Sequence, residues 1–309
     1  MTPFKIAIIG ECMIELQKKG DDLKKAFGGD TLNTALYLSR LTHEKGIVTS
    51  YVTALGHDSF SKDMLSAWKE ENIDTSLIPL LNEKQPGLYL IETDDTGERT
   101  FHYWRNDAAA KYLFDQAESA TLIENLMSFD AVYLSGITLA ILTPSGRNEL
   151  FAFLEKFKEK GGKVIFDNNY RPKLWDSKEQ AQSYYLQALN VTDIALLTFE
   201  DDQDLFGDEV LEECIKRTAG AGVKEIIIKR GSKDCLVVEG ENAAYVAAQK
   251  ITNVVDTTAA GDSFSAGFLA KRFCGGSAIE AAKVAHSIAG AVIQHRGAII
   301  PKDAMPKML

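Results

Sequence analysis

A regular alternation of short apolar runs and helical stretches occupies the chain from residue 121 onward, and it restricts the possible folds more than any other feature. Each apolar run has the length of a buried strand, and the runs lie at residues 131–134, 163–166, 194–198 and 226–229. Stretches with helical spacing lie between them, near residues 145–160, 178–189 and 209–220. Strands that alternate with helices in this way form βαβ units. We therefore predict an α/β fold with a central, mostly parallel sheet and helices on both of its faces.

The remaining segments extend this fold and do not form a second domain. Before the alternation, the pattern predicts strands at 5–9 and 48–54 and helices near 31–41 and 56–71. After it, the pattern predicts a hairpin at 234–238 and 244–247 and an Ala-rich helix at 278–293. The chain has no internal repeat, no low-complexity tract and no linker long enough to divide it. Residues 1–309 are thus predicted to form one domain.

Two β-rich pieces, at about residues 11–17 and 87–105, interrupt the α/β pattern. In the second piece, Leu88–Ile91 is predicted to be a strand and Arg99–Trp104 its return strand, with a hairpin turn at Asp94–Gly97. We predict that the two pieces form a small sheet separate from the central one.

Composition excludes several kinds of partner. The formal net charge is −10 at pH 7, which argues against nucleic acid or an anionic membrane as the main partner. No apolar run reaches the length of a membrane span. The N-terminus leads into a strand without a signal-peptide pattern, so the cytoplasm is the expected location. The 4 cysteines lack metal-ligand spacing and are expected to be reduced and buried.

One short stretch, Asp256–Phe264, combines small residues with the start of a helix. The small residues let a ligand approach the backbone, and an apolar run with helical spacing begins after Asp262. The start of a helix has unpaired N–H groups and a positive dipole end, which suit a phosphate. A carboxylate at the same place suggests that Asp262 accepts a proton while phosphate charge is held beside it. The alternative interpretation is that Asp262 is an ordinary helix N-cap.

Asp256–Phe264 resembles the C-terminal signature of the ribokinase-like (PfkB) family of sugar kinases, Asp-Thr-x-Gly-Ala-Gly-Asp-x-Phe. Ala259 stands where the family usually has glycine, so a positive φ at this residue would be strained. Gly28–Asn33 resembles the family's N-terminal Gly-Gly-x-x-x-Asn motif. The two motifs have the expected order and separation, and the resemblance covers essentially the whole chain. It implies a ribokinase-like fold in which the two β-rich pieces form a lid over the sugar.

The resemblance implies a role for each residue of the C-terminal signature. Asp262 would accept the proton of the sugar hydroxyl as its oxygen attacks the phosphate. The backbone N–H groups of Ala259, Ala260, Gly261 and Asp262 would form an anion hole for the transferred group.

The N-terminal motif is implied to bind the sugar. Gly29 would let the backbone approach the sugar, while Asp30 and Asn33 would supply directional acceptors and donors to its hydroxyls. The alternative interpretation of Asp30 is an N-cap of the helix that follows it.

ATP is implied to bind across the ends of several strands, where α/β sheets usually hold ligands. The implied contacts are Asn169, Arg171, Thr198, Lys229, Gly231, Ala259 and Gly261. Thr198–Asp201 stands where many relatives carry Asn-x-x-Glu, a motif tied to Mg²⁺ and phosphate through water. Both replacements keep an oxygen, so Asp201 is the candidate metal contact, with Glu200 and Asp202 as close rivals. The resemblance leaves open whether a monovalent cation binds near Asp256.

The substrate is inferred from arginines, because a guanidinium fork matches a carboxylate. Arg105, Arg171, Tyr89 and Tyr103 resemble substrate contacts of the family members that act on keto-deoxy sugar acids. This branch implies ATP-dependent phosphorylation of 2-dehydro-3-deoxy-D-gluconate to its 6-phosphate. The alternative interpretations are a lid-surface position for Arg105 and an ion pair with Asp167 for Arg171.

Two further classes of function remain as alternatives. One is a kinase for a neutral ketose such as fructose, or for another deoxyketo acid. The other is a sugar-sensing protein that binds ligands without turnover. In all of these the partners are small molecules, and the exposed lid implies a homodimer or higher oligomer formed through it.

Overall fold

The structure is a computed structural model that describes residues 3–93 and 99–307. Its central sheet has 8 strands in the order β12-β11-β10-β9-β8-β7-β1-β4. Neighbouring strands from β10 to β4 are parallel, while β11 and β12 form an antiparallel hairpin at one edge. The bounds are β1 Phe4–Ile9, β4 Ile47–Val52, β7 Ala131–Ser135, β8 Lys163–Asp167, β9 Ile194–Thr198, β10 Glu225–Lys229, β11 Cys235–Glu239 and β12 Asn242–Val246. The predicted mostly parallel sheet is confirmed.

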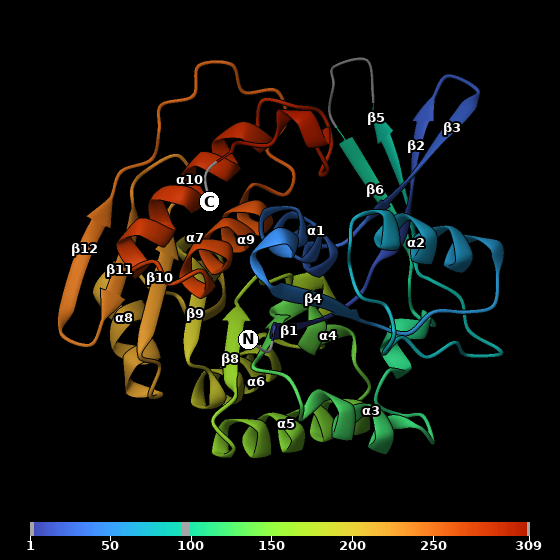
Figure 1. Ribbon diagram of the computed structural model, residues 1–309, viewed down its shortest axis with the longest axis horizontal. Coiled ribbons are helices and arrows are strands. Elements are labelled where there is room, and N and C mark those ends of the chain that lie inside the picture. The colour runs from blue at the N-terminus through green and yellow to red at the C-terminus, as the bar shows by residue number, and fades with distance from the viewer. Residues whose placement is uncertain (1–2, 94–98, 308–309) are drawn as a thin grey trace.

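Helices cover both faces of this sheet (Figure 1). One face packs against α1 Asp30–Thr42, α2 Ser59–Glu70, α9 Ala260–Phe273 and α10 Ala278–Val292. The other packs against α3 Ser119–Leu126, α4 Gly136–Ile141, α5 Pro144–Glu159, α6 Lys178–Val191, α7 Phe199–Phe206 and α8 Leu211–Gly220.

Burial on both faces explains why the strand segments are continuous apolar runs. In β7, for example, Tyr133 belongs to the core on the α9 side, and its neighbours Val132 and Leu134 belong to the core on the α5 side. Successive side chains of a strand point to opposite faces, so every position of such a strand meets a core.

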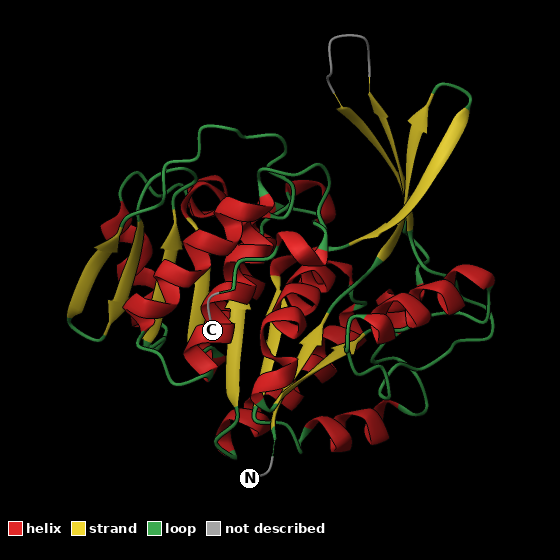
Figure 2. Cartoon of the chain, turned by 45° about the horizontal axis from the view of Figure 1, so that its top comes forward, coloured by secondary structure: helices red, strands yellow, loops and turns green. Residues whose placement is uncertain are grey.

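A second sheet of 4 strands projects from the α/β body (Figure 2). Its order is β3-β2-β5-β6, with bounds β2 Met13–Lys19, β3 Asp22–Gly28, β5 Leu88–Thr93 and β6 Arg99–Trp104. The predicted small sheet is confirmed, but its first piece is longer than expected. Residues 22–28 form a strand that the sequence analysis did not predict, because the first four are exposed and the apolar residues among them do not alternate clearly with polar ones. The predicted hairpin turn at 94–97 lies outside the described residues.

The arrangement directs several strand ends toward one region. The parallel strands β1 and β7–β10 all end at the same edge of the central sheet, and the segments that follow them lie beside the N-terminal ends of α1 and α9. Ligands of α/β proteins usually bind at this edge. Among the described residues, no helix combines the length and the hydropathy needed to cross a lipid bilayer.

Candidate active site

A cavity of about 530 Å³ lies between the carboxyl edge of the central sheet and the second sheet. It brings together almost all of the residues predicted from the sequence: Gly29, Asp30, Asn33, Tyr89, Tyr103, Asn169, Arg171, Thr198, Asp201, Lys229, Gly231 and Ala259 through Asp262. Arg105 is the predicted residue that does not line it. Residues as far apart in the sequence as Gly29 and Asp262 therefore line the same cavity, as the two motifs predicted.

Asp262 lies in the first turn of α9 and is partly buried at the cavity wall. Asn33 donates from Nδ2 to Asp262 Oδ2 at 2.8 Å. Desolvation, and secondly the negative charge of Asp30, raise the pKa of Asp262 to about 7, against the lowering effects of Asn33 and Lys229. The N-cap position belongs to Ala259, so the alternative interpretation of Asp262 as an ordinary N-cap is wrong.

The start of α9 is held in an unusual backbone conformation. Ala259 has φ 60° and ψ 16°, in the left-handed region that favours glycine. This confirms the backbone strain predicted for an alanine at the position where the family usually has glycine. The amide of Ala260 donates to Thr257 O at 3.2 Å, so in this conformation that amide is not free for a phosphate. Among the described residues, the amides of Ala259, Gly261 and Asp262 have no backbone carbonyl partner. These three amides are the available part of the predicted anion hole.

The N-terminal motif forms the other wall beside Asp262. Gly29 is the N-cap of α1, and a Cβ atom there would lie 2.2 Å from Glu11 O, so only glycine fits. Asp30 is the first residue of α1 and makes no capping hydrogen bond, so its interpretation as a cap is wrong. Its Oδ2 accepts from Asn169 Nδ2 at 2.6 Å. Asn33 Oδ1 is buried without a partner among the described residues, which leaves an acceptor for a hydroxyl group.

The ends of β8 and β10 contribute a buried ion pair to the cavity, close to the start of α9, where a Cβ atom on Gly261 would lie 3.7 Å from Lys229 Nζ. Lys229 donates from Nζ to Asp167 Oδ2 at 2.8 Å, and Ser265 Oγ donates to the same oxygen at 2.8 Å. Asp167 is thus already paired, so the predicted alternative of an Arg171–Asp167 ion pair is wrong. Arg171 instead lies 3.6 Å from Asp201, and its side chain is 52% exposed.

Asp201 lines the cavity, as predicted for a metal contact. Desolvation raises its pKa to about 6, while the charge of Arg171 acts in the opposite direction. Tyr170 donates its backbone N–H to Asp201 Oδ2 at 3.2 Å. The rivals differ in position: Glu200 is exposed, and Asp202 is buried away from the cavity.

The second sheet contributes an aromatic surface to the cavity. The rings of Tyr89 and Tyr103 lie 5.8 Å apart, and Phe101, which the sequence analysis did not single out, stacks on Tyr103 at 6.3 Å. Tyr89 donates its hydroxyl to Glu15, and burial together with this carboxylate raises the pKa of Tyr89 far above its usual value.

Arg105 directly follows β6 and forms an ion pair with Glu11. Its side chain is only 11% exposed, so the interpretation as a lid-surface arginine is wrong. Glu11 is 4% exposed, and burial raises its pKa although Arg105 lowers it. A Cβ atom at Gly87 would lie 2.8 Å from Glu11 Oε1, so the pair fits tightly between the strands that join the second sheet to the body. Glu11 was missed because its partner is 94 residues away.

Comparison with known proteins first gives the class. Residues 4–305 match the family model described as pfkB family carbohydrate kinase, and the chain belongs to this family. It is 57% identical over 305 residues to the 2-dehydro-3-deoxygluconokinase of Escherichia coli strain K12, covering 98% of this chain and 99% of that protein. It is 46% identical to the 2-dehydro-3-deoxygluconokinase of Haemophilus influenzae, covering 97% of each.

A solved structure confirms the fold. The 2-dehydro-3-deoxygluconokinase of Thermotoga maritima superposes with a TM-score of 0.83 at 21% sequence identity, covering 96% of this chain and 95% of that one. The ribokinase-like architecture inferred from the two motifs is therefore correct.

Proposed function

We propose that this protein transfers the γ-phosphoryl group of ATP to the 6-hydroxyl of 2-dehydro-3-deoxy-D-gluconate, a step of sugar-acid catabolism. The observation that carries this proposal is the carboxylate of Asp262, which lies at the cavity wall beside three amides without carbonyl partners. Relatives named for this activity, at 46–57% identity, support the choice of substrate.

In the proposed mechanism, Asp262 accepts the proton of the sugar hydroxyl while the sugar oxygen attacks the γ-phosphorus and the bond to ADP breaks. Asn33 fixes the carboxylate through Oδ2, which leaves Oδ1 for the incoming proton. The amides of Ala259, Gly261 and Asp262 stabilise the charge of the transferred group. A pKa of about 7 makes the carboxylate a base matched to neutral pH.

Mg²⁺ fits the residues at the nucleotide end of the cavity. Asp201 offers a carboxylate there, and its pKa of about 6 leaves it ionised at neutral pH. Oxygen donors of this kind suit Mg²⁺, which commonly binds through one or two carboxylates plus phosphates and water. When bound, the ion would neutralise charge on the phosphates. The N–H of Tyr170 holds the Asp201 carboxylate in position for this contact.

Substrate choice depends on two arginines that differ in their surroundings. Arg171 is half exposed at the cavity. Its Nη1 donates to the carbonyl oxygen of Tyr170 at 2.7 Å and lies 3.6 Å from Asp201, so its other guanidinium nitrogens can receive a carboxylate. Arg105 is engaged by Glu11 and is therefore oriented before the substrate arrives. We propose that both arginines recognise the carboxylate of the sugar acid. Arg171 contacts it directly, and Arg105 acts from its position at the base of the second sheet.

A coupled assay of ADP release on a panel of sugars tests the function. The parent is expected to turn over 2-dehydro-3-deoxy-D-gluconate far faster than fructose. Arg171→Ala should raise KM for the acid by about 10-fold or more, since a charge-assisted contact is worth about 1.5–3 kcal/mol. Arg105→Lys, which keeps the charge beside Glu11 but removes the fork, should raise the same KM.

Arg230→Ala is the matched control for these arginine variants. Arg230 also lines the cavity, at its nucleotide end, and pairs with Asp234 at 3.0 Å. This control should leave KM for the acid unchanged. Equal KM values for the acid in all 3 variants and the parent would remove the assignment of the substrate. Faster turnover of fructose would favour the ketose alternative, and binding of sugar without ADP release would favour a sensor.

We also propose that residues 1–309 act as one domain, in the cytoplasm, with ATP and the sugar acid as small-molecule partners. Comparing rates with and without K⁺ would test whether a monovalent cation contributes near Asp256.

A further inference from the structure

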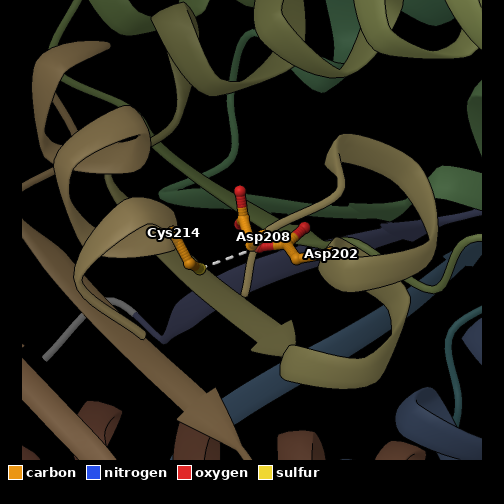
Figure 3. Close-up of side chains that lie close together, drawn as sticks. All are labelled: Asp202, Asp208 and Cys214. Atoms are coloured by element: carbon orange, nitrogen blue, oxygen red, sulfur yellow. Dashed lines mark hydrogen bonds between the residues drawn. The ribbon is translucent and has the colours of Figure 1, made fainter. Parts of the chain in front are cut away.

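A buried cluster of Asp202, Asp208 and Cys214 lies on α7, α8 and the loop between them (Figure 3). Their ligand atoms lie within 4.8 Å of one another, but the cluster already contains its own donors. Cys214 donates from Sγ to Asp202 Oδ2 at 2.8 Å, and Arg217 pairs with Asp208 and, at 3.3 Å, with Asp202. The other carboxylate oxygen of Asp202, Oδ1, accepts a hydrogen bond from Asn168 Nδ2 at 3.2 Å. The cluster therefore anchors Asn168.

Both polar atoms of the Asn168 side-chain amide form hydrogen bonds that link the ends of β8 and β9 at the cavity. Its Nδ2 donates to Thr198 O at 2.9 Å as well as to Asp202, and its Oδ1 accepts from the amides of Asn169 at 2.9 Å and Thr198 at 2.8 Å. The backbone pairing of the two strands stops at Asp167 and Leu196. The side chain of Asn168, 1% exposed, therefore continues the connection between the strands one step further.

The residues held by Asn168 are the ones that face the cavity. Asn169 has φ 23°, an uncommon value for a residue other than glycine, and the bond from its amide to Asn168 Oδ1 supports that conformation. In this conformation Asn169 Nδ2 reaches Asp30 Oδ2. Thr198, whose N–H and C=O both bind Asn168, also lines the cavity.

We propose that Asn168 is a positioning residue: anchored by Asp202, it holds Asn169 and Thr198 in the geometry that the sugar and nucleotide require. It contacts no substrate itself, since it lies outside the cavity lining. This inference rests on the proposed kinase function for its catalytic readout.

The test exchanges the two side chains. Asn168→Asp keeps the acceptor for the amides of Asn169 and Thr198 but loses both donors, and it places a second carboxylate against Asp202. It should lower kcat/KM by about 10- to 100-fold, the cost of a small misplacement of positioned groups. Adding Asp202→Asn restores a donor between the two side chains. The double variant should therefore recover most of the lost kcat/KM.

Asp193→Ala is the matched control. Asp193 joins the same two strands at their opposite ends, where its Oδ2 accepts from the Val164 amide at 2.9 Å. Its loss should lower Tm without changing kcat or either KM. If Asn168→Asp does not fold, Asn168→Ala is compared with the Asp193→Ala control in its place, because alanine brings no new charge.

The proposal is overturned if the Asn168 variants lower Tm but keep the parent kcat and KM, as the control does, or if the double variant recovers nothing. A parent that phosphorylates no sugar would instead refute the proposed function. In that case ATP affinity, measured by calorimetry on the same variants, tests the positioning role without any sugar: the single variants should bind ATP more weakly than the parent, and unchanged affinity would refute the role.

Discussion

At the scale of single residues, catalysis depends on how the neighbours of Asp262 set its protonation. Desolvation and the charge of Asp30 raise its pKa to about 7. Because the base must be ionised, kcat/KM should rise with pH through an apparent pKa of about 7. Asp30→Asn removes one of the raising charges, so it should move the midpoint to lower pH in the kcat profile at saturating sugar. A pH-independent rate between pH 5 and 8 would contradict the assignment of the base.

Removing the carboxylate should separate activity from stability. Asp262→Asn should lower kcat by about 10²- to 10⁴-fold. Because the pKa of Asp262 is raised from 3.8 in the unfolded chain to about 7, the folded state binds the extra proton, and stability falls as pH rises between these values. The variant lacks this loss and should melt no lower than the parent at pH 8. Thermal melts of both proteins at pH 5 and pH 8 check this. If the Tm of Asp262→Asn at pH 8 were far below that of the parent, the ionised carboxylate would stabilise the fold.

Short contiguous motifs explain why so many site residues could be predicted. Gly29, Asp30, Asn33 and the residues around Asp262 lie in two stretches whose composition is unusual on its own. Asn168 and Glu11 could not be found this way, because their function depends on partners far away in the sequence. Asp202 lies 34 residues from Asn168, and nothing in either local sequence indicates the hydrogen bond.

At the scale of elements, the turn into α9 contains a strained residue. Ala259 in the left-handed region costs roughly 1–2 kcal/mol, against a flexibility cost of about 0.5–1 kcal/mol for glycine. Ala259→Gly should therefore raise the free energy of unfolding by up to about 1 kcal/mol. The neighbouring change Ala260→Gly, at the first residue of α9, relieves no positive φ and should lower it by up to about 1 kcal/mol. Denaturant unfolding of the two variants decides the matter, and a loss of stability in both would exclude strain at Ala259.

Elements with two buried faces were predictable, while exposed or short ones were not. The strands β7–β10 match their predicted ranges closely because a core on each face demands a continuous apolar run. By contrast β3, with the sequence DLKKAFG, is exposed at its first four residues and has no clear alternation. The helices α4 and α7 were missed because they span only 6 and 8 residues directly after strands.

At the scale of the whole molecule, the second sheet has one face toward the cavity and one away from it. Met13, Tyr89 and Tyr103 point to the cavity, so by alternation Leu16, Leu90 and Trp104 lie on the opposite face. On that face α2 covers only one end, where Lys25 pairs with Asp63 at 2.5 Å. Trp104 remains 60% exposed. Glu92, which lies 3.1 Å from Lys18 and 3.0 Å from His102, is on the same face, so this face is partly apolar and partly charged. An exposed tryptophan in such a setting is typical of a surface that another molecule covers.

We expect that a second copy of the chain covers this face, because the sheet of one copy can pack against the same sheet of another in a closed, two-fold arrangement. The parent should sediment as a dimer at micromolar concentration. Trp104→Glu should shift it to the monomer, because a carboxylate would be buried without a partner in the interface. Leu186→Glu, at a 40% exposed apolar residue on α6, is the matched control and should leave the dimer intact. If the parent is monomeric throughout, or if both variants stay dimeric, the outer face of the second sheet is not the interface. If the monomer forms and KM for the sugar acid rises with it, then the lid depends on its partner to hold Tyr89 and Tyr103 over the substrate.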